Sequence, residues 1–134
     1  MKKKRKKKTP KQLAVVRIWE LCKKYIRLRD KMTCQKCGKV ILNPQGADTS
    51  HVLCKARYKS LKFDENNLKV LCMFCHKWYH NVPTESGEWF KNTFPDRWEY
   101  LREKQYQIRK MNIVVLTEIE EEYKQKIKEI ECLD

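Results

Sequence analysis

The apolar residues of the first third of the chain recur at helical spacing. Between Gln12 and Arg29 they stand roughly three or four positions apart, with basic residues between them. This period predicts an amphipathic helix within residues 12–31 that packs on the rest of the chain and carries Cys22 as a small core residue. The apolar positions of the pattern are Leu13, Val16, Ile18, Leu21, Tyr25, Ile26 and Leu28.

The middle of the chain has shorter apolar runs. Residues 47–54 predict a strand that includes His51 and Cys54, and residues 68–71 predict a second strand. The turn-forming cluster at residues 64–67 separates them. A helix is expected over residues 75–80, so the predicted order is strand, loop, strand, helix.

The last third of the chain predicts helices. Pro83 and Pro95 each favour a helix start, and the last helix is expected over most of residues 96–131, with a break near Asn112. Its final part has one apolar stripe, which either packs back on the domain or pairs with a second copy as a short coiled coil. We favour the second arrangement, a homodimer. The stripe consists of Leu116, Ile119, Tyr123, Ile127 and Ile130.

Composition and charge narrow the classes of function. The chain has 134 residues, 31 lysines and arginines against 17 acids, and a formal net charge of +14. Eight of these positive charges fall within residues 2–11. Such a block is expected to form a disordered arm over residues 1–11 that binds nucleic acid by releasing counterions, although it could also be a solubilising tail or a targeting signal. Six further basic residues are expected to contact phosphates, namely Lys23, Lys24, Arg27, Arg29, Lys55 and Arg57.

The location of the protein is expected to be cytoplasmic, in a host cell if the protein is viral. The chain opens on lysines rather than on an apolar signal segment, and it has no run of about 20 apolar residues that would span a membrane. In this reducing compartment the seven cysteines are expected to stay reduced, whereas in an oxidising compartment they could form disulfides.

Two cysteine pairs have the spacing of a metal site. Cys34 and Cys37 are separated by two residues, as are Cys72 and Cys75. This spacing lets a tight turn direct both sulfur atoms of a pair at one tetrahedral ion. We therefore predict a structural Zn²⁺ held by four thiolates, with Gly38 allowing the turn after the first pair to close.

The order of residues around these pairs resembles the HNH endonuclease superfamily, in its subgroup with a four-cysteine zinc site. The resemblance to the superfamily covers about residues 33–80. Within the superfamily, the chain is most similar to phage recombination nucleases of the NinG (Rap) type, and this resemblance extends to roughly residues 15–100. The match to the latter consists of the segment 25–30 before the first cysteine pair and an aspartate three places before the first histidine. The residues that match the superfamily are Cys34, Cys37, His51, Asn67, Cys72, Cys75 and His76.

The resemblance implies a fold and a set of roles. The fold would be α+β, with a small ββα-metal (His-Me finger) core at residues 32–82, stapled by the zinc site and followed by a C-terminal helical extension at residues 83–134. His51 would be the general base and Asn67 would orient its ring through the side-chain carbonyl. His76 would bind a divalent catalytic cation, and His80, one turn later, lies on the same helical face and can share that ion.

One position departs from the superfamily pattern. Many members place a metal ligand immediately before the general base, where this chain has Ser50. Asp48 lies on the same side of the strand and is expected to replace it as a ligand. The cation could be Mg²⁺, Mn²⁺ or Zn²⁺, with the histidine pair favouring a transition metal or zinc.

These observations predict a metal-dependent DNA endonuclease that hydrolyses phosphodiester bonds. The resemblance to NinG (Rap) nucleases implies action on branched or junction DNA, such as a Holliday junction, during phage recombination. Duplex DNA is the other expected substrate. One alternative is a zinc-stabilised nucleic-acid-binding protein without catalytic activity, and another is a site-specific or homing-type HNH nuclease.

Overall fold

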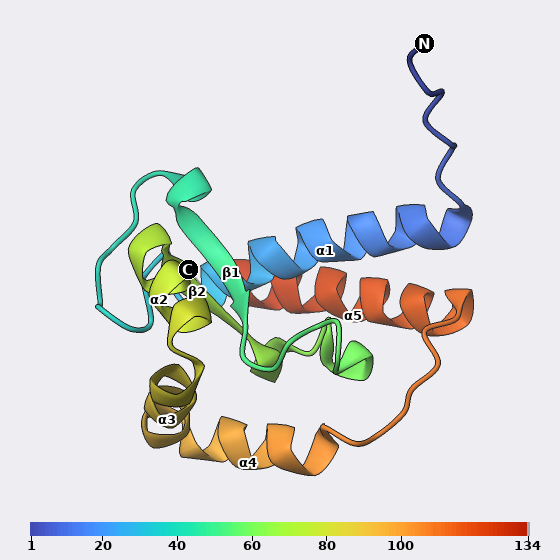
Figure 1. The fold of residues 1–134 in the computed structure, drawn as a ribbon. Coiled ribbons are helices and arrows are strands. Elements are labelled where there is room, and N and C mark those ends of the chain that lie inside the picture. Colours follow the sequence, from blue (N-terminus) through green and yellow to red (C-terminus); the bar gives the residue numbers. More distant parts are fainter. Residues whose placement is uncertain (134) are drawn as a thin grey trace.

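The protein has a mixed α+β fold of five helices and one two-stranded antiparallel sheet within residues 1–133, the part of the chain that the computed structural model describes (Figure 1). Three short 3-10 helices lie in the connections, at Pro44–Gly46, Lys59–Leu61 and Glu65–Asn67. The main elements are α1 (Pro10–Arg29), β1 (Ala47–His51), β2 (Leu68–Cys72), α2 (Met73–Asn81), α3 (Pro83–Thr93), α4 (Pro95–Lys104) and α5 (Ile113–Cys132).

Helix α1 begins two residues earlier than the apolar period suggested. Thr9 accepts a hydrogen bond from the backbone N–H of Gln12, and the side chain of Gln12 accepts one from the backbone N–H of Thr9. Pro10 occupies the first helical position, where its missing N–H costs nothing. The basic arm is therefore confined to residues 1–9, which extend away from the body of the protein (Figure 1).

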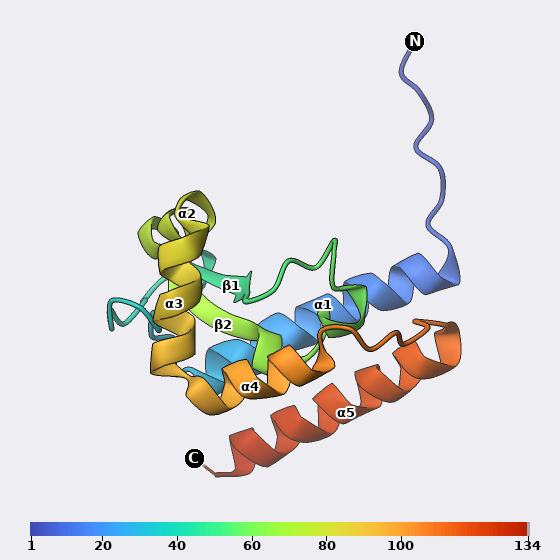
Figure 2. The same cartoon turned by 60° about the horizontal axis from the view of Figure 1, so that its bottom comes forward.

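Helices α1 and α5 lie side by side and run in the same direction (Figures 1 and 2). Ion pairs join Arg17 to Glu120 at 3.1 Å and Lys24 to Glu131 at 3.2 Å, near the two ends of the contact. Four buried residues of α1 and three of α5 belong to the main core. These residues are Ala14, Ile18, Cys22 and Ile26 on α1, and Leu116, Ile119 and Tyr123 on α5, where Ile127 is also buried.

The apolar stripe of α5 therefore packs back on its own chain. Leu116 is fully buried and the hydroxyl of Tyr123 donates to the carbonyl of Phe63. Helix α5 begins at Ile113, after the break expected near Asn112, and the Asn112 side chain caps it by accepting from the N–H of Val115. A homodimer through α5 stays a prediction, and it would need a surface other than the stripe that suggested it.

Strand β1 pairs with β2 in an antiparallel register that places Ala47 opposite Cys72 and His51 opposite Leu68. The expected strand over residues 47–54 is too long, since β1 ends at His51. Cys54, which was predicted to belong to this strand, lies beyond its end and is exposed. Beyond His51 one further backbone bond reaches the turn before β2, and the next carbonyls accept from buried side chains.

Helices α2, α3 and α4 follow β2. Helices α3 and α4 form a second, smaller core with the segment after β1. Pro83 and Pro95 each occupy the first position of a helix, so the chain turns sharply before both. Phe90 of α3 is fully buried, and its ring lies 5.2 Å from that of Phe94. The aromatic residues of this region thus pack together. None of the helices that the structure describes combines the length and the apolar character needed to cross a lipid bilayer.

We predict that Leu116→Ala lowers the free energy of unfolding by about 2–5 kcal/mol, because it leaves a cavity between α1 and α5. Urea denaturation followed by circular dichroism measures this change. Ile108→Ala is the control, since Ile108 is almost fully exposed and its truncation should change stability by less than about 0.5 kcal/mol. Equal stabilities of the two variants would contradict the packing described here.

Candidate functional site

The four cysteines of the two pairs come together in space. Their sulfur atoms all lie within 4.8 Å of one another, and Sγ of Cys37 is 3.9 Å from Sγ of Cys72. Four sulfurs around one zinc ion, each bonded at about 2.3 Å, would be separated by roughly 3.8 Å. All seven cysteines are free thiols in the structure, so no disulfide competes for these sulfurs. The cluster could therefore hold a zinc-type ion, as the spacing predicted.

Local backbone geometry brings each pair into position. Lys31 and Met32 adopt positive φ angles of 54° and 52°, which turn the chain back after α1. Gly38 has a φ of 77°, the conformation that the turn after the first pair requires. The second pair spans the junction of β2 and α2, where Cys72 caps the helix by accepting from the N–H of Cys75. The cluster thus ties the loop after α1 to the start of α2.

A cleft beside this cluster contains the three histidines. It has a volume of about 530 Å³ and lies between α1, the segment after β1, and helices α2 to α4. His51 comes from β1, whereas His76 and His80 come from α2. Its other lining residues are Trp19, Thr49, Val52, Leu53, Cys54, Lys55, Tyr79, Pro83, Ser86, Gly87 and Trp98.

The ring of His51 is held on two sides. It stacks on the indole of Trp19, with ring centroids 5.2 Å apart and planes 10° from parallel. Its Nε2 lies 3.0 Å from the carbonyl oxygen of Lys62. A carbonyl oxygen only accepts hydrogen bonds, so Nε2 must carry the proton, and in the neutral ring Nδ1 keeps its lone pair. This is the tautomer that a general base needs.

The environment of His51 keeps this ring neutral. The pKa of His51 is lowered from 6.5 to about 4, mainly by burial and in part by the charges of Lys55, Lys69 and Lys62. The hydrogen bond to the carbonyl of Lys62 acts in the opposite direction. At neutral pH the Nδ1 atom is therefore unprotonated and can accept a proton.

Asn67 has a different contact from the one expected. Its side-chain oxygen accepts from the N–H of Leu53 at 2.7 Å, and its amide nitrogen donates to the carbonyls of Leu53 and Leu61, both at 3.1 Å. None of its hydrogen bonds within the described residues reaches the ring of His51. Asn67, which is fully buried, instead fixes the segment that leaves β1 directly after His51.

The two histidines of α2 face one another. Nε2 of His76 and Nε2 of His80 are 2.9 Å apart. Nitrogen ligands at adjacent positions of one ion, with bonds of about 2.1 Å, would lie about 3 Å apart. Burial lowers the pKa of His80, and the neighbouring His76 and Lys69 add to this effect, which favours the neutral form that binds metals. The pair could hold a divalent cation.

Asp48 contacts the other side of this pair. Its Oδ2 lies 3.1 Å from Nδ1 of His76, so it accepts the proton of that nitrogen and leaves Nε2 of His76 with its lone pair. Direct coordination by Asp48 was expected, but the geometry favours an orienting role. Carboxylates that hold the second nitrogen of a ligand histidine fix its ring and raise its basicity.

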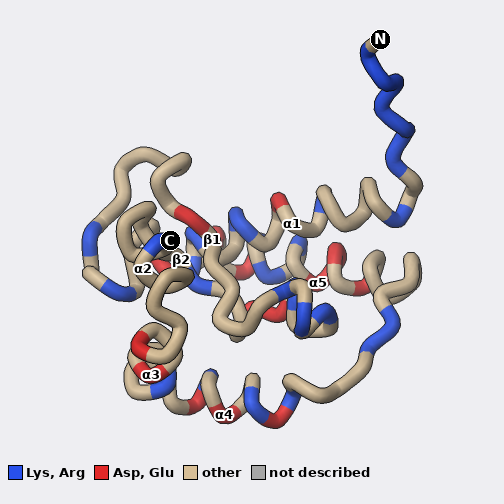
Figure 3. The backbone as a smooth tube through the Cα atoms, in the orientation of Figure 1, with Lys and Arg blue, Asp and Glu red and all other residues tan. Residues whose placement is uncertain are grey.

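The basic residues predicted to bind phosphate are in two different situations. Lys55 and Arg57 follow β1 and are exposed, with Lys55 in the cleft and 6.0 Å from the ring of Trp19. Lys23 pairs with Glu20 at 2.7 Å, and Lys24 has the ion pair with α5 already described. Figure 3 shows the uneven charge, with lysines and arginines along the N-terminal arm and acids along α5.

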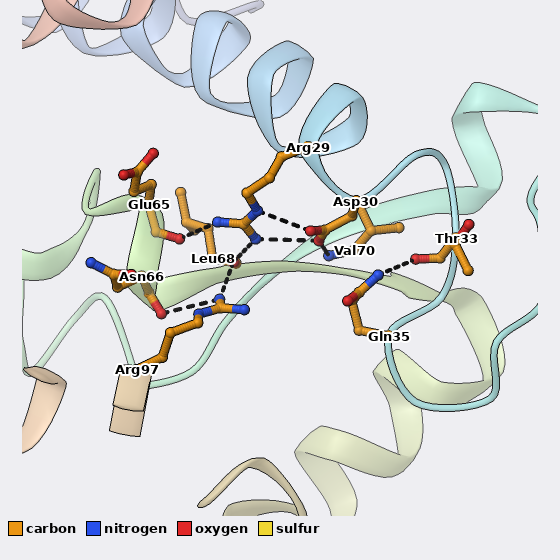
Figure 4. Close-up of polar contacts among 9 residues, drawn as sticks. All are labelled: Arg29, Asp30, Thr33, Gln35, Glu65, Asn66, Leu68, Val70 and Arg97. Atoms are coloured by element: carbon orange, nitrogen blue, oxygen red, sulfur yellow. Dashed lines mark hydrogen bonds and ion pairs between the residues drawn. The ribbon is translucent and has the colours of Figure 1, made fainter. Parts of the chain in front are cut away.

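The two arginines at the end of α1 bind backbone carbonyls. Arg27 donates to the carbonyl of Ala47 at 3.2 and 3.3 Å. Arg29 donates to the carbonyls of Glu65 and Leu68 at 2.7 and 2.6 Å, and it pairs with Asp30 (Figure 4). Phosphate contact by these two side chains stays a prediction, and it would compete with the bonds that hold α1 to the sheet.

Sequence reasoning missed three residues of the site. Trp19 was not among the apolar positions of the helical pattern, and no contact with the site was predicted for Tyr79. Lys69 gave the only available signal, because it is a charged residue within the otherwise apolar run of residues 68–71. Its side chain is fully buried beneath the end of β1.

Comparison with known proteins finds no matching family model, no similar curated protein and no similar solved structure. The geometry of the site and the sequence resemblance must therefore carry the functional argument.

We predict that Cys75→Ser abolishes zinc binding, because three thiolates and a hydroxyl hold the ion less well than four thiolates. Metal analysis of the purified protein should give about one zinc ion per wild-type chain. Cys54→Ser is the matched control and should keep this zinc, since Cys54 lies outside the cluster. Equal zinc contents in all three proteins would refute the assignment.

The lowered pKa of His51 predicts a pH-dependent stability. Below pH 6.5 the unfolded chain binds a proton at His51 that the folded chain does not bind until about pH 4, so stability is lost as the pH falls through this range. Allowing for partial solvent exposure of the ring, we expect a loss of about 1 kcal/mol between pH 7 and pH 5. Urea denaturation of wild type and His51→Gln measures it, and a variant that loses as much stability as wild type would contradict the prediction.

Proposed function

We propose that this protein is a metal-dependent DNA endonuclease of the HNH type with a ββα-metal core. The observation that carries the proposal is the placement of His51 in one cleft with the pair His76 and His80. His51 is neutral and has a free Nδ1, and the pair has the nitrogen spacing of two ligands on one ion. The order β1, β2, α2 beside a four-cysteine cluster agrees with the resemblance to this superfamily.

The residues of the cleft have complementary roles in this proposal. Nδ1 of His51 accepts a proton from a water molecule whose oxygen bonds to phosphorus, while the bond from phosphorus to the leaving 3′ oxygen breaks and that oxygen takes a proton from solvent. The carbonyl of Lys62 and the ring of Trp19 keep His51 in the required tautomer and orientation. A divalent cation bound at His76 and His80 would stabilise negative charge on the phosphate and the leaving oxygen.

The charge of the protein supports DNA as the substrate. The arm at residues 1–9 and the exposed Lys55 and Arg57 are available to phosphates without breaking contacts of the fold. Such contacts give affinity with little sequence preference. The narrower assignment to branched DNA in phage recombination rests on the resemblance to NinG (Rap) nucleases.

The test is cleavage of end-labelled four-way junction, linear duplex and single-stranded DNA, with Mg²⁺, with Mn²⁺ or without a divalent cation. Wild type should cut only with a divalent cation, and His51→Ala should cut at least about 100-fold more slowly because the proton acceptor is gone. DNA affinity and zinc content should stay unchanged in this variant. The control is Gln125→Ala on the exposed face of α5, which should cut at the wild-type rate.

Other outcomes would replace the proposal. Binding without cutting by wild type, under every cation, would support a zinc-stabilised binding protein. Cleavage of one defined sequence in linear duplex would favour a site-specific or homing-type nuclease over a structure-specific one.

A further inference from the structure

Lys69 is the one charged side chain that is fully buried among residues 1–133. It belongs to β2, in the ladder position directly opposite Ser50. Its Nζ donates to Oγ of Ser50 at 3.1 Å and to the carbonyl oxygen of His51 at 3.3 Å. The same nitrogen lies 3.6 Å from the centre of the Tyr79 ring. A lysine of β2 thus reaches the backbone of the proposed general base.

The position of Lys69 is an unfavourable one for a charge. No acid of the described residues forms an ion pair with it, and two aromatic rings, those of Tyr79 and Phe90, lie over its nitrogen. Burial lowers the pKa of Lys69 well below its usual value, Arg97 lowers it further, and Asp30 opposes them. An apolar residue would fill this site at a smaller desolvation cost. Lysine, unlike an apolar residue, supplies the two hydrogen bonds at this site, and a neutral amine can donate both of them.

Lys69 is one of three side chains that hold successive carbonyl groups after β1. The amide of Asn67 binds the carbonyl of Leu53, and the hydroxyl of Tyr79 binds that of Val52 at 2.8 Å. Lys69 binds the carbonyl of His51 itself. It is therefore the member of this group that acts directly on the residue whose ring must face the substrate.

We propose that Lys69 is a positioning residue for His51, whose hydrogen bonds to Ser50 and to the His51 carbonyl hold the imidazole in its working orientation. The inference rests on the proposed nuclease function for its catalytic meaning. The contact itself is independent of that function. Because Lys69 is buried, it takes no part in binding DNA, and its loss should act on the rate of cleavage alone.

The experiment compares wild type with Lys69→Met, which keeps an unbranched side chain, one atom shorter, and removes the donor. Ser50→Ala removes one of the two acceptors with little change in volume and serves if Lys69→Met does not fold. Lys128→Met is the charge-matched control, since Lys128 is exposed on α5. For each protein we would measure zinc content, the urea midpoint, DNA affinity and single-turnover cleavage.

Each folded protein would also be labelled with ¹⁵N in its imidazoles. The spectrum reports which nitrogen of His51 carries the proton, and this readout does not depend on cleavage.

We expect Lys69→Met to keep its zinc and its DNA affinity but to cut about 10- to 100-fold more slowly, as small displacements of a reacting group do. The His51 signals should shift toward a mixture of tautomers. Ser50→Ala should give the same changes to a smaller extent, and Lys128→Met neither change.

Unchanged His51 signals in folded Lys69→Met, or in Ser50→Ala if that is the variant measured, would overturn the proposal. An unchanged rate of cleavage would do the same. If wild type does not cut at all, the nuclease proposal fails, and the imidazole spectra still decide whether Lys69 positions His51.

Discussion

The backbone that leaves β1 runs against buried side chains, and its polar groups must find partners inside the protein. The carbonyls of residues 51–53 receive hydrogen bonds from Lys69, Tyr79 and Asn67 in turn. These three side chains come from β2, α2 and the turn before β2, so the segment ties together elements that are distant in the sequence. The orientation of the His51 ring, and with it the proposed chemistry, depends on this set of bonds.

The cysteine cluster positions the helix that carries the other two histidines of the site. A chain of this size has a small core and gains from a staple, and four thiolates that surround one ion would join the loop after α1 to the start of α2. Helix α2 carries His76 and His80, so the cluster fixes where both imidazoles stand relative to β1. The structural ion and the proposed catalytic ion would therefore have separate ligands but a common helix.

Much of the fold could be predicted from local patterns, whereas the contacts of the site could not. The starts of α3 and α4 followed from prolines, and the cysteine cluster followed from spacing, because both are set by residues close in sequence. The role of Asn67 was missed because its partner Leu53 lies 14 residues away in the sequence. Leu53 was also expected to belong to β1, which ends before it. Asp48 and His76 are 28 residues apart in the sequence, and only the packing of α2 beside β1 brings them into contact. Nothing in the helical pattern marked Trp19 as a partner of His51.

The central claim is that one cation and one neutral imidazole act on the same phosphate. It is tested most directly by the anomalous diffraction of Mn²⁺ in crystals of the protein with a short DNA, using His51→Ala to prevent cleavage. The account predicts manganese between Nε2 of His76 and Nε2 of His80, with a DNA phosphate bound to it beside the position of residue 51. Manganese elsewhere, or a cleft that holds the ion but faces away from the DNA, would contradict it.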